Sequence, residues 1–112
     1  RRVGNDRNGG SLAGGGVEMD LERHRVCRDG RAISLAPTEY RLLKVMMERP
    51  GRVYSREQLL DLVWGRDIYV EARTVDVHIR RLRKSLNADG AHDLIRTVRS
   101  AGYAFEPEMA DY

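Results

Sequence analysis

The residues best suited to chemistry in this sequence are arginines gathered in one stretch, and the chemistry they suit is the binding of a polyanion. Residues 73–84 hold five Arg or Lys residues against one Asp, a local net charge of +4, whereas the whole chain carries +3. Arginine binds phosphates and guanine edges through paired N–H groups. The stretch is therefore a candidate nucleic-acid surface.

A helix over residues 72–86 would place these charges on one face. At about 100° per residue, a buried stripe is predicted on one side, formed by Val75, Ile79, Leu82 and Leu86. The opposite face collects Arg73, Val77, Arg80, Arg81 and Lys84, with Thr74 and His78 along one shoulder. Only Asp76 is spaced to pair with a cation (Arg80) on this helix, whereas a solvated face usually mixes signs. A valine among arginines suits a thymine methyl, although a solvated charged face remains the alternative.

Groups for catalysis or metal binding are not gathered in the sequence. Asp76, His78 and Ser85 would share one helix and cannot converge around a substrate. Cys27 is the single cysteine, and nothing supplies further ligands at zinc spacing, so a half-buried strand cysteine is the favoured interpretation. We expect no enzymatic activity, no metal and no cofactor.

The composition is that of one soluble domain. The chain has 112 residues, 41% hydrophobic and 33% charged, and a sequence pI near 9.4 fits a polyanionic partner. No apolar run approaches the roughly 20 residues that span a bilayer, and no signal peptide is visible. We expect a cytoplasmic protein without a membrane partner.

Two regions differ in composition. Residues 1–16 hold six of the eleven glycines and are predicted to be a flexible interdomain linker or added residues. Residues 17–112 are predicted to fold, beginning with strands over 17–21, 26–28 and 32–35 and a helix over 37–49. A second helix is expected to open with a capping box between Ser55 and Gln58 and to end at Gly65. Its predicted apolar face is Leu59, Leu60, Leu62, Val63 and Trp64.

A hairpin is predicted after the basic helix, with strands over 94–99 and 103–105. A hairpin in this place is typical of a winged helix, in which the helix enters the major groove and the wing approaches the backbone or the minor groove. Thr97 and Arg99 share one face of the predicted wing. The expected class is α+β, a winged helix-turn-helix, although a hairpin that merely closes the core would have the same pattern.

Several motifs, in the same order, resemble the effector domain of OmpR/PhoB-family response regulators. They are APTEYRLL at 36–43, GRVYSREQLLDLVWGRDIYVEARTVDVHIRRLRKSL at 51–86 and IRTVRSAGYAF at 95–105. The resemblance implies a four-stranded N-terminal antiparallel sheet, three helices and a C-terminal β-hairpin wing. It also implies a preceding receiver domain, phosphorylated by a sensor kinase, and activation of transcription, with phosphate-responsive genes as candidate targets.

The helix pattern and the resemblance together give twelve candidate DNA contacts. They are Arg56, Trp64, Arg73, Thr74, Val77, His78, Arg80, Arg81, Arg83, Lys84, Thr97 and Arg99, with Arg81 and Val77 nearest the bases. The resemblance further implies a contact with the sigma subunit of RNA polymerase by Glu57, Trp64, Gly65, Arg66 and Asp67. It implies tandem head-to-tail dimers on direct repeats of double-stranded DNA.

Some alternatives stay open at this stage. Trp64 could belong to the core, which is slightly favoured, or to an interface. Three positions depart from the family pattern: Ala72 in place of an acidic residue, Ser100 in place of the wing glycine, and Ala104 in place of a basic residue. A winged-helix protein-interaction module that docks an acidic partner, or an RNA-binding module, would share the basic helix.

Overall fold

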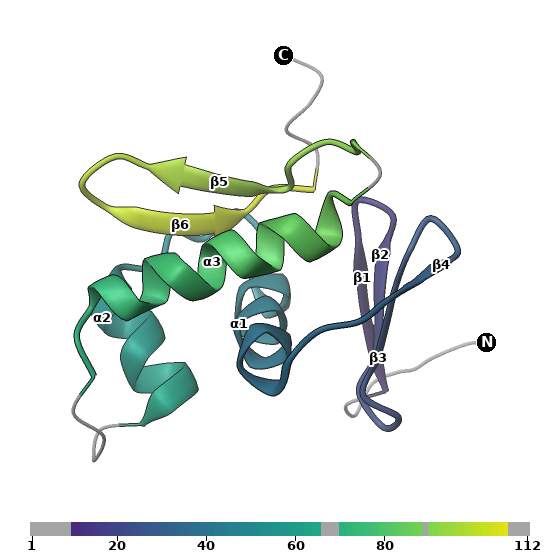
Figure 1. Ribbon diagram of the computed structural model, residues 1–112, viewed down its shortest axis with the longest axis horizontal. Coiled ribbons are helices and arrows are strands. Elements are labelled where there is room, and N and C mark those ends of the chain that lie inside the picture. The colour runs from purple at the N-terminus through teal and green to yellow at the C-terminus, as the bar shows by residue number, and fades with distance from the viewer. Residues whose placement is uncertain (1–9, 66–69, 89, 108–112) are drawn as a thin grey trace.

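The computed structural model describes residues 10–65, 70–88 and 90–107. In chain order its elements are β1 (Ser11–Gly14), β2 (Val17–Asp20), β3 (Arg25–Arg28), β4 (Arg31–Ile33), α1 (Pro37–Glu48), α2 (Arg56–Leu59), the π-helical η2 (Leu60–Trp64), α3 (Arg73–Leu86), β5 (Ile95–Val98) and β6 (Gly102–Phe105). Figure 1 shows α3 lying between the β5–β6 hairpin and the other helices. The expected α+β architecture is confirmed. Among the described helices, none is both long and apolar enough to cross a bilayer.

The first four strands form one antiparallel sheet in the order β1-β2-β3-β4. Val17 and Met19 are fully buried on one face, as their alternation predicts. The predicted linker over residues 1–16 was wrong for residues 11–14, because Ser11–Gly14 pairs with β2 along its whole length. A short, glycine-containing strand of this kind is formed by its neighbour rather than by an apolar pattern of its own. Residues 1–9 lie outside the described part of the chain.

Helix α1 is the centre of the hydrophobic core. Its side chains Leu42, Leu43 and Met46 are fully buried, and the helix contacts α3, η2, β1 and β6. Pro37 occupies its first turn, where the missing N–H costs nothing. The preceding Ala36 offers no side-chain cap.

The second helix begins as predicted and ends differently. The Ser55 Oγ accepts from the Gln58 N–H at 3.0 Å, and the Gln58 Oε1 accepts from the Ser55 N–H at 2.9 Å, so the capping box is confirmed. The helix then widens into a π turn, in which the Gly65 N–H donates to the Leu60 carbonyl. This widening changes the phase of the side chains. The prediction that Leu62 faces the core was therefore wrong, since it is 56% exposed.

The β5–β6 hairpin is completed by the segment before α2. Tyr54 and Tyr103 form a bridge through two backbone hydrogen bonds of 2.8 and 2.9 Å. Gly102 lies at φ 140°, and a Cβ there would fall 1.8 Å from the Tyr54 carbonyl oxygen, so the position requires glycine. Ser100, which stands in place of the wing glycine, lies at φ 66°, in the left-handed region that strains a residue with a side chain. Ala104 is fully buried, so its side chain faces the core rather than a phosphate.

Candidate nucleic-acid interface

Helix α3 is fixed to the domain by one hydrophobic stripe. Val75, Ile79, Leu82 and Leu86 are each at most 2% exposed, as the helical periodicity predicts. Burial of one such side chain stabilises the fold by about 1.5–3 kcal/mol. The stripe therefore determines which side of α3 remains available to a ligand.

The available side of α3 is cationic with one apolar residue in its middle. Its exposed members are Arg73, Val77, Arg80, Arg81 and Lys84, as predicted, and Thr74 is half-buried on the shoulder. The Arg73 Nε lies 2.7 Å from the Glu71 Oε1, but both side chains are more than 70% exposed. A surface pair of this kind contributes at most about 1 kcal/mol and can be exchanged for a phosphate.

Asp76 joins α3 to two other elements. Its Oδ1 accepts from the Arg56 Nε at 2.9 Å and from the Tyr103 hydroxyl at 2.5 Å. Burial alone would raise the pKa of Asp76, but the hydrogen bonds from Tyr103 and Arg56 outweigh it and lower the pKa below its ordinary value. The predicted partner Arg80 adds a longer-range attraction that acts in the same direction. Asp76 therefore remains ionised and holds Arg56 and the wing against the helix.

The same contact changes the properties of the wing tyrosine. Burial, followed by the hydrogen bond to the Asp76 carboxylate, raises the pKa of Tyr103, and Arg56 opposes this only in part. The phenol therefore stays protonated at neutral pH and acts as a donor. One carboxylate, one guanidinium and one phenol thus form a fixed junction of α2, α3 and β6.

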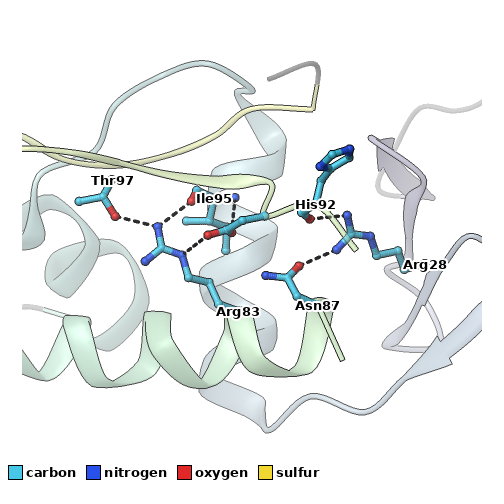
Figure 2. A network of polar contacts seen from close by, with 7 residues as sticks. Arg28, Arg83, Asn87, His92, Ile95 and Thr97 are labelled. Atoms are coloured by element: carbon cyan, nitrogen blue, oxygen red, sulfur yellow. Dashed lines mark hydrogen bonds and ion pairs between the residues drawn. The ribbon is translucent and has the colours of Figure 1, made fainter. Parts of the chain in front are cut away.

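Two predicted DNA contacts, Arg83 and Thr97, contact each other. The Arg83 Nη2 donates to the Ile95 carbonyl at 2.6 Å and to the Thr97 Oγ1 at 2.7 Å (Figure 2). Its Nε also lies 3.0 Å from the Asp93 Oδ2, and the guanidinium stacks 5.7 Å from the Tyr103 ring centre. Arg83 therefore braces the wing against α3, an arrangement that spacing along the sequence did not indicate.

His78 and Trp64 are also partly engaged within the protein. The His78 Nδ1 lies 2.7 Å from the Oε2 of Glu39, whose side chain is almost fully buried on α1. The Trp64 ring packs against the core and meets the His78 ring edge-on, with 5.3 Å between centres. Sequence reasoning missed Glu39, because its place on an apolar helix gave no sign that a histidine would approach it.

The remaining candidates lie at the ends of the surface. Arg56, Glu57 and Gly65 are exposed, and Arg99 is exposed at the turn of the wing. Arg56 and Thr97 line one cavity of about 240 Å³ between the start of α2 and the wing. Two predicted polymerase contacts, Arg66 and Asp67, lie outside the described residues.

Comparison with known proteins agrees with this geometry. The family model "Transcriptional regulatory protein, C terminal" matches residues 30–105, which is more than half of the chain. The phosphate regulon transcriptional regulatory protein PhoB of Rhizobium meliloti (strain 1021) is 61% identical over 92 residues, which cover 82% of this chain and 40% of that protein. The chain belongs to the OmpR/PhoB family.

Solved OmpR/PhoB-type DNA-binding domains share the fold over nearly their whole length. The RstA DNA-binding domain of Klebsiella pneumoniae, solved in complex with the RstA box, matches with a TM-score of 0.76 and 29% identity, covering 87% of this chain and 97% of that one. The AdeR DNA-binding domain, solved with an intercistronic region, matches with a TM-score of 0.75 and 30% identity, covering 81% and 94%. The winged-helix assignment is therefore confirmed. The family consists of DNA-binding transcription regulators rather than enzymes, which agrees with the sequence-based expectation.

Proposed function

We propose that this OmpR/PhoB-type domain binds double-stranded DNA sequence-specifically and regulates transcription as the effector domain of a two-component response regulator. The observation that carries the proposal is the exposed face of α3, where four cations surround Val77 and the opposite side is fully buried. A helix of this shape can enter the major groove without losing any contact to its own core. We propose activation as the mode of regulation and phosphate-responsive genes as targets, supported by the PhoB relative.

We assign base contacts to the centre of that face. Arg81 and Val77 lie one helical turn apart and are both exposed, so an arginine fork and a methyl-binding residue can face adjacent base pairs. Arg73, Arg80 and Lys84, with Thr74 at the shoulder, are proposed to contact phosphates or flanking bases. Arg99 at the wing turn is proposed to approach the minor groove.

The engaged residues are proposed to act at the edge of the interface. The Arg83, Thr97 and His78 side chains are each bonded within the protein, which leaves them fewer donors for DNA. Arg56 keeps a 52% exposed side chain while Asp76 orients it, and this arrangement suits a phosphate contact. Trp64 is proposed to donate a hydrogen bond from its indole N–H to the same phosphate.

A second surface is proposed to meet the sigma subunit of RNA polymerase. Glu57 lies on α2, the exposed Leu62 and Trp64 lie on η2, and Gly65 follows at the end of η2. Arg66 and Asp67, which belong to the same proposed contact, lie outside the described residues. An exposed leucine near the acidic Glu57 suits contact with a protein partner rather than with DNA.

We propose that this domain is part of a larger response regulator. The chain spans 40% of the PhoB relative. We propose an N-terminal receiver domain, its sensor kinase and a tandem head-to-tail dimer on direct repeats, acting in the cytoplasm.

Selection of bound sequences from a random duplex pool tests this function. We expect direct repeats about 10–11 base pairs apart, one helical turn. If about six phosphates are neutralised per protomer, log K should fall with log salt at a slope near −5. A domain that enriches no duplex would contradict the proposal and favour docking of an acidic protein, while tighter binding to RNA than to DNA of equal length would favour an RNA-binding role.

A further inference from the structure

Arg28 reaches from the N-terminal sheet to the far end of α3. It lies on β3 and is only 7% exposed. Its Nη1 donates to the Leu86 carbonyl at 2.9 Å and to the Asn87 Oδ1 at 2.7 Å, and its Nη2 donates to the His92 carbonyl at 2.6 Å. One guanidinium therefore contacts both sides of the connector between α3 and β5 (Figure 2).

These contacts replace a helix cap. The last carbonyls of an α-helix lack partners within the helix, and a cation near them is favoured by the helix dipole. Helix α3 ends at Leu86, and neither the C-cap Asn87 nor Ala88 after it has the left-handed conformation that often closes a helix. Arg28 supplies both a donor and a positive charge at this end, from a residue 58 positions earlier in the chain.

The connector is held from two directions. Arg83 ties the last turns of α3 to Ile95 and Thr97 on β5, while Arg28 ties the start of the connector to the sheet. Figure 2 shows the two guanidinium groups on opposite sides of the same segment. The placement of α3 relative to the wing therefore depends on both arginines.

Burial of the Arg28 guanidinium costs free energy, because the charged group loses its water. Its three acceptors are uncharged oxygens, and its buried Nε has no hydrogen-bond partner in the described part of the chain. Desolvating a guanidinium against neutral acceptors stabilises a fold weakly, whereas fixing one arrangement of neighbouring elements is a well-attested role of buried polar groups.

We propose that Arg28 is a positioning residue for DNA recognition, which sets the C-terminal part of α3 relative to the wing without touching DNA itself. The inference rests on the proposed DNA-binding function. Specific recognition needs base contacts from α3 and contacts from the wing on one duplex at once. Non-specific binding through phosphates tolerates a looser arrangement.

The test compares Arg28→Met with Arg25→Met in the whole chain. Arg25 lies on the same strand with its side chain exposed, so its variant removes the same charge without the contacts. For Arg28→Met we expect a loss of about fivefold to twentyfold in affinity for the selected duplex, within the range for loss of one coupling contact. Affinity for a random duplex and the salt slope should stay unchanged. Arg25→Met should leave all of these values near those of the wild type.

Hydrogen exchange provides a readout that does not need DNA. Amides of the last turn of α3 and of β5 should exchange faster in Arg28→Met and not in Arg25→Met. Arg28→Lys keeps the charge and should restore part of the affinity. Asn87→Ala removes one acceptor of Arg28, so it should change affinity and hydrogen exchange in the same direction by a smaller amount. If Arg28→Met does not fold, Asn87→Ala takes its place in the test.

Three results would overturn the inference. They are wild-type affinity in Arg28→Met, an equal loss on selected and random duplexes, or a salt slope shallower by about one charge, which would indicate a direct phosphate contact. A wild-type domain that prefers no duplex would instead refute the proposed function. In that case, amide hydrogen exchange at the end of α3 in Arg28→Met and Arg25→Met would still decide whether Arg28 positions the helix.

Discussion

Replacement of Arg81 by alanine separates base recognition from general attraction to DNA. Arg81 is exposed in the middle of α3, four residues after Val77, and Leu82 beside it is fully buried. Substitution of an exposed residue away from caps and networks changes stability by less than about 0.5 kcal/mol. Nearly the whole effect of Arg81→Ala should therefore appear in binding.

The expected magnitude follows from the contact assigned to Arg81. Loss of an arginine that is bidentate to guanine costs about 1–3 kcal/mol, which is roughly a fivefold to 150-fold weaker affinity for the selected duplex. The loss on random duplex should be much smaller, because no base contact exists there. Fluorescence anisotropy with both duplexes at one salt concentration measures the two values together.

Arg56→Ala gives the contrasting pattern. The Arg56 guanidinium is held by Asp76 at the start of α2, outside the central face of α3. Its loss should weaken selected and random duplexes by the same factor and make the salt slope shallower by about one.

An exposed arginine on α1, outside the twelve candidate contacts, is the control for the removal of one charge. Arg41→Ala should leave the preference between the two duplexes unchanged. Equal losses for Arg81→Ala on both duplexes, or the same preference change in Arg41→Ala, would refute the assignment of Arg81 to the bases.

Three further predictions concern the scaffold. Leu82→Ala removes a fully buried side chain beneath the interface and should cost about 2–5 kcal/mol in chemical denaturation; a loss under about 1 kcal/mol would show that the stripe does not anchor α3. Because folding lowers the pKa of Asp76, its stabilisation is complete above the ordinary value of 3.8 and is lost as pH falls through the lowered pKa. Wild type should therefore lose more stability than Asp76→Asn between pH 6 and pH 3, and parallel losses in urea denaturation would contradict this linkage. Gly102→Ala should destabilise far more than Gly30→Ala, since both have positive φ but only the Gly102 Cβ meets the Tyr54 backbone; similar melting temperatures for the two variants would exclude the clash.

Patterns confined to one helix were predictable. The buried stripe of α3 and its cationic face follow from the 3.6-residue period, which depends only on the helix itself. The capping box of Ser55 and Gln58 spans three residues and is likewise local. The wing was predicted from two short strands around a turn. The family resemblance then specified the kind of winged helix, that of OmpR/PhoB-type effector domains.

Errors arose where a neighbour or a change of helix type decided the outcome. β1 has little apolar character and exists because β2 offers it backbone partners. Leu62 was placed on the buried side by an α-helical phase that the π turn of η2 breaks. Neither feature is visible in the periodicity of the segment concerned.

The sequence by itself determined which face of α3 is buried and which is exposed and cationic, because hydrophobic and charged residues repeat along a single helix axis. Only the tertiary structure decided which of the many arginines are available. Arg81 stays exposed, whereas Arg83 and Arg28 are bonded to the wing and to the connector after α3. The physical reason is that a guanidinium can bind any oxygen within reach, and the path of the chain alone brings those oxygens from 12 and 64 residues away.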